Sequence, residues 1–136
     1  MTGRRFGLVA MAAAIAGVLA IASAAAQDDA PTALPYEAEM LRLSEIMGAL
    51  HYLRRLCVSE HDSGWRDAME ALLDAEQPDA VRRARMIDRF NRGYEGYRSV
   101  YRACTPAAEA VVERFLDEGA RLAADLNARY GETQSE

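Results

Sequence analysis

Two cysteines, Cys57 and Cys104, constrain the fold of this chain more than any other feature of its sequence. In a reducing compartment, two thiols so far apart in sequence place no constraint on each other. In an oxidising compartment they pair and hold two distant segments together. The N-terminus therefore decides how the cysteines are interpreted, because it indicates the compartment in which the chain folds.

The N-terminus has the pattern of a secretory signal peptide. A basic pair, Arg4 and Arg5, precedes an uncharged apolar run and then a short run of alanines that ends at Ala26, and small residues there are what signal peptidase accepts. We expect residues 1–26 to be a signal peptide cleaved after Ala26, so that the mature chain is periplasmic. An uncleaved membrane anchor is the alternative, because no charged residue occurs between Arg5 and Asp28.

Export predicts that Cys57 and Cys104 form a disulfide. The mature chain is long enough for one core, yet small enough that a covalent crosslink adds usefully to its stability. The full chain has a formal net charge of −5 at pH 7, and loss of the two arginines of the signal would make the mature chain more acidic. On average such a domain is repelled by nucleic acid, which we therefore do not expect as a partner. After signal cleavage we expect no membrane span.

Helical periodicity dominates the mature chain, and no alternating strand pattern of useful length occurs in it. We expect an all-α fold, a small four-helix bundle with three long helices, one short helix and one disulfide. The helical domain is expected at 36–131. A flexible leader precedes it at 27–35, where two prolines oppose regular structure, and a disordered polar tail follows at 132–136.

The first helix is expected from about Tyr36 to Val58. Apolar residues recur there at every seventh position, so one face of the helix must be buried; these residues are Tyr36, Leu43, Leu50 and Cys57. A second, short helix follows. Asp62 or Ser63 can provide its N-cap, and Pro78 is expected to end it.

The third helix has the longest apolar pattern. Pro78 is expected in its first turn, where the missing N–H of a proline is not needed. Apolar residues then step by three or four over about 25 residues, which predicts a helix that ends at Cys104. The stripe expected to face the core consists of Val81, Ala84, Ile87, Phe90, Tyr94, Tyr97, Tyr101 and Cys104.

The fourth helix is expected to begin at a pair typical of helix starts. Thr105 is the expected N-cap, and Pro106 occupies the first helical position. Apolar residues at helical spacing continue to Tyr130. Gly131 follows, where we expect a left-handed C-cap.

Short loops between successive helices predict that neighbours are antiparallel, so the first and third helices run in the same direction. Cys57 and Cys104, at the ends of these helices, then lie at the same pole of the bundle. This placement uses only the helical period, and it agrees with the disulfide inferred from export.

Tyrosines and arginines concentrate near the end of the third helix. Gly93 and Gly96 lie among them, and each interior glycine costs a helix roughly 1 kcal/mol relative to alanine, so a compensating role is expected. One interpretation is close packing of another helix. The other is a shallow groove in which arginines bind carboxylates or phosphates and tyrosine rings stack on sugars. The residues expected to form this surface are Arg92, Tyr94, Tyr97, Arg98, Tyr101 and Arg102, with Arg98 and Arg102 as an i,i+4 pair.

More arginines extend this basic character toward the start of the third helix; they are Arg82, Arg83, Arg85 and Arg89. They favour an anionic or acidic partner, and in the periplasm the expected ligand is peptidoglycan. A solvated face with intrahelical ion pairs is the alternative. Apolar or aromatic residues left over on this helix would equally serve as the seam of a homodimer.

No pattern in the sequence is typical of a catalytic or metal site. His51 and His61 are the only histidines, and we find too few further ligands to complete a metal site with them. We expect His51 to be hydrogen-bonded or partly exposed. Nucleophile elbows, HExxH, phosphate loops and haem-attachment motifs are absent. We therefore expect no catalytic residues, no cofactor and no enzymatic activity.

Two blocks of the sequence resemble a known family. One is Gly48–Cys57 and the other is Phe90–Pro106. The family is an uncharacterised group of small exported alphaproteobacterial proteins, defined as a domain of unknown function with two well-separated cysteines, and the resemblance covers roughly 40–108. It implies a periplasmic location, a disulfide between Cys57 and Cys104 and a role in growth of the cell envelope. It implies no catalytic residues.

The sequence thus favours a non-enzymatic periplasmic helical module that binds peptidoglycan or a protein of cell-wall growth or division. A periplasmic chaperone or stress-sensor adaptor that holds other proteins is the main alternative. The LTxxQ repeats of one such group are absent, which counts against it. An envelope hydrolase is a third alternative, which would require a cleft with converging polar groups.

Overall fold

The computed structural model describes residues 33–131, which belong to one compact unit of the chain that begins at Ala33. The expected signal peptide at 1–26, most of the expected leader at 27–35 and the expected tail at 132–136 lie outside the described residues. Everything below concerns the helical part.

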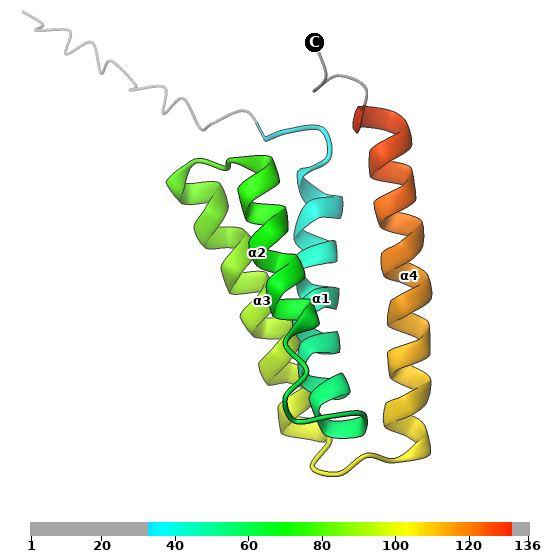
Figure 1. Cartoon of the computed structure of the whole chain (residues 1–136). Helices are drawn as coiled ribbons and strands as arrows, with labels where there is room; N and C mark the ends of the chain where they lie inside the picture. Colours follow the sequence, from blue (N-terminus) through cyan, green and yellow to red (C-terminus); the bar gives the residue numbers. More distant parts are fainter. Residues whose placement is uncertain (1–32, 132–136) are drawn as a thin grey trace, which may run out of the picture. The chain divides into compact units, whose positions relative to one another are not determined.

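Four helices and no strand make up the described residues, as expected. They are α1 (Glu37–Cys57), α2 (Gly64–Glu76), α3 (Ala80–Val100) and α4 (Pro106–Tyr130). Successive helices run in opposite directions, so that α1 and α3 point the same way (Figure 1). The prediction of an all-α bundle with one short helix and three long ones is confirmed.

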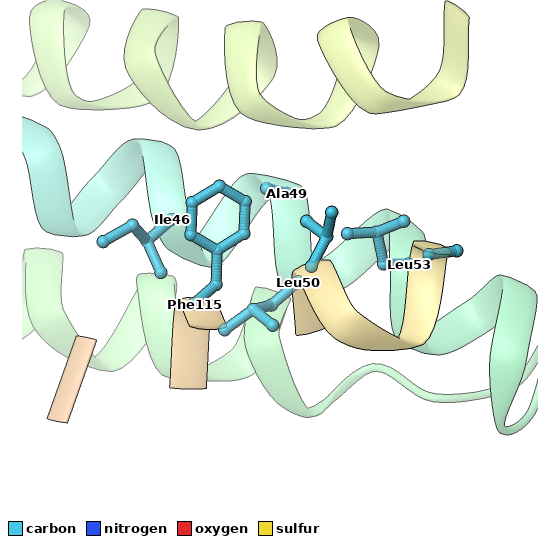
Figure 2. Close-up of a cluster of buried hydrophobic side chains, with 7 residues drawn as sticks. Ile46, Ala49, Leu50, Leu53 and Phe115 are labelled. Atoms are coloured by element: carbon cyan, nitrogen blue, oxygen red, sulfur yellow. The ribbon is translucent and has the colours of Figure 1, made fainter. Parts of the chain in front are cut away.

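α1 is the central helix of this bundle. The other three helices pack on it, while their backbones hardly approach one another. Buried residues therefore extend around most of α1, and Ile46, Leu50 and Leu53 are all at most 1% exposed. Figure 2 shows one of the resulting core clusters, in which Phe115 of α4 lies against the α1 side chains. Any surface formed by two of the outer helices has α1 as its floor.

The disulfide joins Cys57, the last residue of α1, to Cys104, with 4.9 Å between their Cα atoms. The predicted pairing is confirmed, but the prediction that Cys104 ends α3 is wrong. α3 ends at Val100, and Tyr101 is already extended. The hydroxyl of Tyr52 on α1 donates to the carbonyl oxygen of Tyr101, and a side-chain donor of this kind satisfies a carbonyl where a helix stops. Cys104 thus lies in the loop before α4.

The prediction is also wrong for the first half of the α3 stripe that was expected to face the core. Val81 is 53% exposed and Ile87 is 38% exposed, whereas Arg82 and Met86 are buried in their place. Arg82 can be buried there, although it is charged, because it has partners in the interior. Its Nε donates to Glu37 at 2.7 Å and its Nη2 to Glu76 at 2.9 Å.

This buried ion-pair group connects three helices. Glu37 belongs to α1, Glu76 to α2 and Arg82 to α3, and the guanidinium carbon of Arg82 also lies 5.4 Å from the centre of the Tyr36 ring. Burial by itself lowers the pKa of Arg82, but its hydrogen bonds to the two glutamates outweigh burial and raise the pKa above its ordinary value. A cation paired in this way is tolerated in the interior because its charge is compensated.

The helix ends agree with the sequence-based predictions except at Pro78 and Gly131. Asp79 caps α3 by accepting from the N–H of Arg82, so Pro78 precedes the cap instead of opening the helix. Thr105 caps α4, with Pro106 first in the helix, as predicted. The backbone of Gly131 has the right-handed helical conformation, at φ −65°, because its N–H still donates to the carbonyl oxygen of Asn127 as in the helix. The left-handed cap belongs instead to Gln77 after α2, at φ 44°.

Two glycines bring α1 and α3 into backbone contact. A Cβ on Gly48 would overlap the carbonyl oxygen of Phe90, and a Cβ on Gly93 would overlap that of Glu45. Only glycine permits so close an approach at these positions. A Cβ on Gly96 would meet nothing within 4 Å. Close packing therefore explains Gly93, whereas Gly96 has no such role.

We expect the Gly93→Ala variant to lose about 1–3 kcal/mol of unfolding free energy, since the new methyl group must push two backbones apart. The matched variant Gly96→Ala should be unchanged or more stable by up to about 1 kcal/mol, because alanine is the better helix former. Urea denaturation of both proteins measures the difference. Equal stability of the two variants would contradict the close backbone contact between α1 and α3 at Gly93.

The disulfide predicts a second effect on stability. It closes a loop with a sequence separation of 47, and the double variant Cys57→Ser, Cys104→Ser should lose roughly 4 kcal/mol of unfolding free energy through the larger entropy of its unfolded chain. A reductant should lower the thermal midpoint of the wild-type protein and leave that of the variant unchanged. A reductant effect of equal size on both would contradict this assignment.

Candidate functional site

Positive charge is concentrated on one helix. α3 carries six arginines against two acidic residues, whereas α2 carries one against four and α4 carries three against five. Apart from the buried Arg82, the arginines of α3 are exposed. α3 and the loop after it therefore form a basic surface on a domain that is otherwise acidic or neutral.

The arginines of this surface differ in how far they are already neutralised. Arg92 pairs with Asp88 at 2.8 Å. Arg98 pairs with Glu95 at 2.7 Å, and the hydrogen bond to Glu95 raises the pKa of Arg98. Arg102 is exposed and makes no ion pair with any described residue. Because α3 ends before it, Arg102 is not the i,i+4 partner of Arg98 that the sequence analysis expected.

The three tyrosines of the predicted surface are half-buried, and their rings pack between helices. The Tyr94 ring meets the Tyr52 ring edge-on, with centroids 5.4 Å apart. The Tyr97 ring meets Phe115 of α4 in the same way at 5.3 Å, and lies parallel to the Tyr101 ring at 6.3 Å. These rings therefore position the end of α3, and only their outer parts are open to a ligand.

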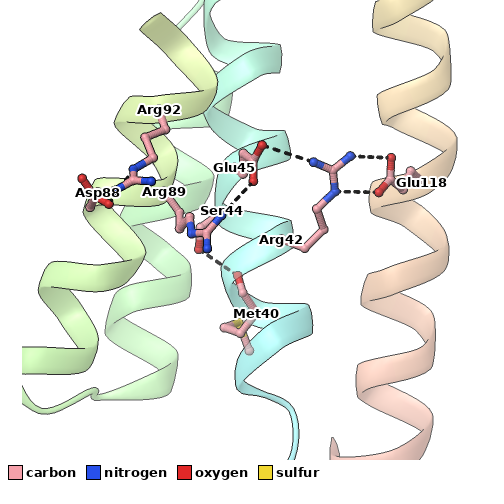
Figure 3. A network of polar contacts seen from close by, with 8 residues as sticks. All are labelled: Met40, Arg42, Ser44, Glu45, Asp88, Arg89, Arg92 and Glu118. Carbon is pink, nitrogen blue, oxygen red and sulfur yellow. Dashed lines mark hydrogen bonds and ion pairs between the residues drawn. The ribbon is translucent and has the colours of Figure 1, made fainter. Parts of the chain in front are cut away.

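A polar network holds α3 and α4 in place across α1. Figure 3 shows Arg89 of α3 reaching Glu45 of α1, which also pairs with Arg42, and Arg42 reaching Glu118 of α4. The Arg42 guanidinium donates to both carboxylate oxygens of Glu118 at 2.7 and 3.0 Å. These hydrogen bonds raise the pKa of Arg42 and lower that of Glu118. Arg89 is therefore partly engaged within the domain.

His51 is buried, contrary to the expectation of a hydrogen-bonded or partly exposed residue. It is 8% exposed, its ring lies 5.8 Å from that of Phe90 and 5.7 Å from that of Tyr94, and its Nδ1 atom has no hydrogen-bond partner. Burial lowers the pKa of His51, and the nearby Arg55 and Arg66 lower it further. The ring therefore packs as a neutral aromatic group.

Sequence reasoning missed an apolar groove between α2 and α4. The larger of its two hollows has a volume of about 600 Å³ and is lined only by apolar residues and glycine. Both walls are built from small residues, which leave open the space that larger side chains would fill; these are Ala68, Ala71, Gly119, Ala120 and Ala123. Their spacing of three and four residues was a usable signal, but it does not reveal which helices face each other.

Two further properties concern only the part of the chain that the structure describes. No cluster of three or more histidine, cysteine or acidic side chains there is arranged to bind a metal ion. None of the helices in this part combines the length and apolar character that crossing a bilayer requires.

His51 predicts how stability depends on pH. Because its folded pKa lies below the ordinary value of 6.5, the unfolded chain binds a proton more readily than the folded one. The contribution of His51 to the free energy of unfolding is therefore complete above pH 6.5 and is lost as the pH falls below that value toward the folded pKa. The variant His51→Leu should show a weaker fall in stability between pH 7 and pH 5, measured by urea denaturation.

The exposed His61 provides the matched control for this experiment. The variant His61→Leu should keep the pH dependence of the wild-type protein, because its side chain is hydrated in both states. If the two variants change the pH profile equally, His51 is not the group responsible.

The chain matches the family described as "Protein of unknown function (DUF2385)" over residues 35–130, a range that includes all four helices. No curated protein and no solved structure matches it. The family description names no reaction and no ligand, so an account of function has to come from the surfaces described above.

Proposed function

The chain belongs to the DUF2385 family of proteins of unknown function, and from that starting point we propose that it is a non-enzymatic module of the bacterial cell envelope. In this proposal the mature domain is periplasmic. It binds peptidoglycan or a protein of cell-wall growth or division through α3 and the loop that follows it.

The observation that carries the proposal is the segregation of arginines on α3. Six arginines and two acidic residues share this helix, so its exposed face attracts anions although the whole chain is acidic. Guanidinium groups bind carboxylates with two parallel hydrogen bonds. The peptides of the cell wall carry free carboxylates, and they are therefore suitable ligands for this face.

Among the predicted surface residues, the arginines carry most of the proposed affinity. Arg102 has no ion-pair partner among residues 33–131 to give up on binding, whereas Arg92 and Arg98 each exchange an exposed carboxylate for the ligand, which costs little. The exposed parts of Tyr94, Tyr97 and Tyr101 add apolar contact with sugar rings. Their buried parts keep this surface rigid.

The location belongs to the same proposal. A cleaved export signal at 1–26 and the disulfide between Cys57 and Cys104 both suit an oxidising compartment. The proposal further takes the family to be one of small exported alphaproteobacterial proteins with two well-separated cysteines, as the resemblance of the two sequence blocks implies.

A sedimentation assay with purified sacculi tests this function. We expect the mature domain to sediment with sacculi at low salt, and the triple variant Arg92→Gln, Arg98→Gln, Arg102→Gln to lose most of this retention. Since exposed charges are screened by salt, retention of the wild-type protein should also fall as salt is raised toward about 0.5 M.

A second triple variant, Arg66→Gln, Arg114→Gln, Arg121→Gln, is the matched control. It removes the same amount of charge from α2 and α4 and leaves α3 intact, so it should sediment like the wild-type protein. Equal losses in the two variants would mean that net charge alone governs retention. Absence of wild-type retention at low salt would exclude direct binding to the wall.

The alternative function, a periplasmic chaperone or stress-sensor adaptor that binds other proteins, is favoured by a different observation. The groove between α2 and α4 exposes apolar surface in a hollow of about 600 Å³, and open apolar surface of this kind is typical of sites that bind proteins. Prevention of aggregation of a denatured client by the mature domain would favour this function over wall binding.

A further inference from the structure

The groove between α2 and α4 continues along most of α2. Its larger hollow, near Trp65, and a second hollow, near Tyr36 and Tyr130, share the residues Leu43, Leu72 and Ala123. Leu43 belongs to α1, so α1 forms the floor, while α2 and α4 form the walls. The groove exists because the backbones of both walls pack on α1 and hardly approach each other.

The length of the groove suits one short helix. α2, the shorter wall, has 13 residues, and at a rise of 1.5 Å per residue it is about 20 Å long. Ala68 and Ala71 on one wall and Ala120 and Ala123 on the other have methyl side chains only. Small side chains let the backbone of an inserted helix come close to the floor of the groove, where larger apolar side chains can contact the inserted helix.

The rim of the groove is acidic. On α2, Asp67 and Asp74 lie four residues before and three residues after the wall residue Ala71, which places them beside it on the helix surface. On α4, Asp117 precedes the wall residue Ala120 by three positions. All three aspartates are exposed, and none of them forms an ion pair with another described residue.

We propose that this groove binds an amphipathic helix of a partner protein, one whose apolar face fills the hollow and whose flanks carry lysine or arginine. The apolar lining supplies the affinity through burial, and the unpaired rim carboxylates supply the charge complementarity. This site is separate from the basic surface on α3, and it goes beyond the function proposed above.

The acidic rim also argues against two other occupants. A second copy of this chain, docked groove to groove, would bring like charges together along both walls, which is unfavourable. A fatty acid would place its own carboxylate among those of Asp67, Asp74 and Asp117. A basic amphipathic helix is the occupant whose charge matches the rim and whose apolar face matches the lining.

Trp65 provides a direct readout. It is the one tryptophan of the chain and it lines the larger hollow. The probe is a 14-residue synthetic peptide without aromatic residues, with leucines at i, i+3, i+4 and i+7 spacing and lysines elsewhere. Titration of this peptide into the disulfide-bonded protein should shift the tryptophan emission saturably. A peptide of the same pattern with glutamate in place of lysine should bind at least tenfold more weakly.

Variants on α4 place the peptide in the groove. Asp117→Lys should weaken binding about fivefold, which is the effect of one exposed charge pair. Asp125→Lys makes the same charge change on the same helix, at a position that lies three or four residues from no residue lining the groove, and should leave binding unchanged. Ala120→Phe fills the hollow and should abolish binding. Circular dichroism establishes that each variant is folded.

Three results with the peptides and the protein alone, and a fourth with a lipid, would overturn the proposal. The first three are the absence of any emission change with the lysine peptide, equal binding of the glutamate peptide, and a protein dimer in sedimentation that dissociates in the Ala120→Phe variant. Displacement of the lysine peptide by an equimolar amount of oleate would also overturn it, in favour of a lipid site. The triple variant of α3 should bind the peptide normally, so failure of wall binding and failure of this proposal are separable.

Discussion

The close crossing of α1 and α3 is the constraint on which the rest of the structure depends. At Gly48 and Gly93 the two helices meet backbone to backbone, and this contact sets the rotation of α3 on α1. With that rotation Arg82 enters the interior between Glu37 and Glu76, while Val81 and Ile87 remain exposed. In this arrangement Arg82 is the buried arginine of α3, while the other arginines of the helix remain exposed on its surface.

The central position of α1 has a consequence for function. Because the backbones of α2, α3 and α4 each approach that of α1 and hardly approach one another, the bundle has an open seam between α2 and α4. Charge is divided in the same way, with arginines on α3 and unpaired acidic residues along the seam. The domain therefore offers two surfaces of opposite character, a basic one on α3 and an acidic-rimmed apolar one between α2 and α4.

The candidate site was predictable only in part. Arginines and tyrosines stood out in the sequence, and Arg92, Arg98 and Arg102 are exposed, but Arg102 lies beyond the end of α3 and does not continue the helical face of Arg98. The sequence placed Tyr94 and Tyr97 both on the stripe facing the core and on the candidate surface, because helical spacing shows which residues share a face and does not show which neighbour covers that face. The groove was missed for the same reason, since its walls come from helices far apart in sequence.

The sequence by itself determined the four helices, their alternating directions and the meeting of Cys57 with Cys104, because periodicity, capping residues and short loops are local properties. Tertiary structure alone decided where α3 stops, how it is rotated and which helices leave a gap. Those outcomes depend on contacts between distant residues, such as the hydroxyl of Tyr52 on the carbonyl of Tyr101. A local pattern carries no information about a partner contributed by another helix.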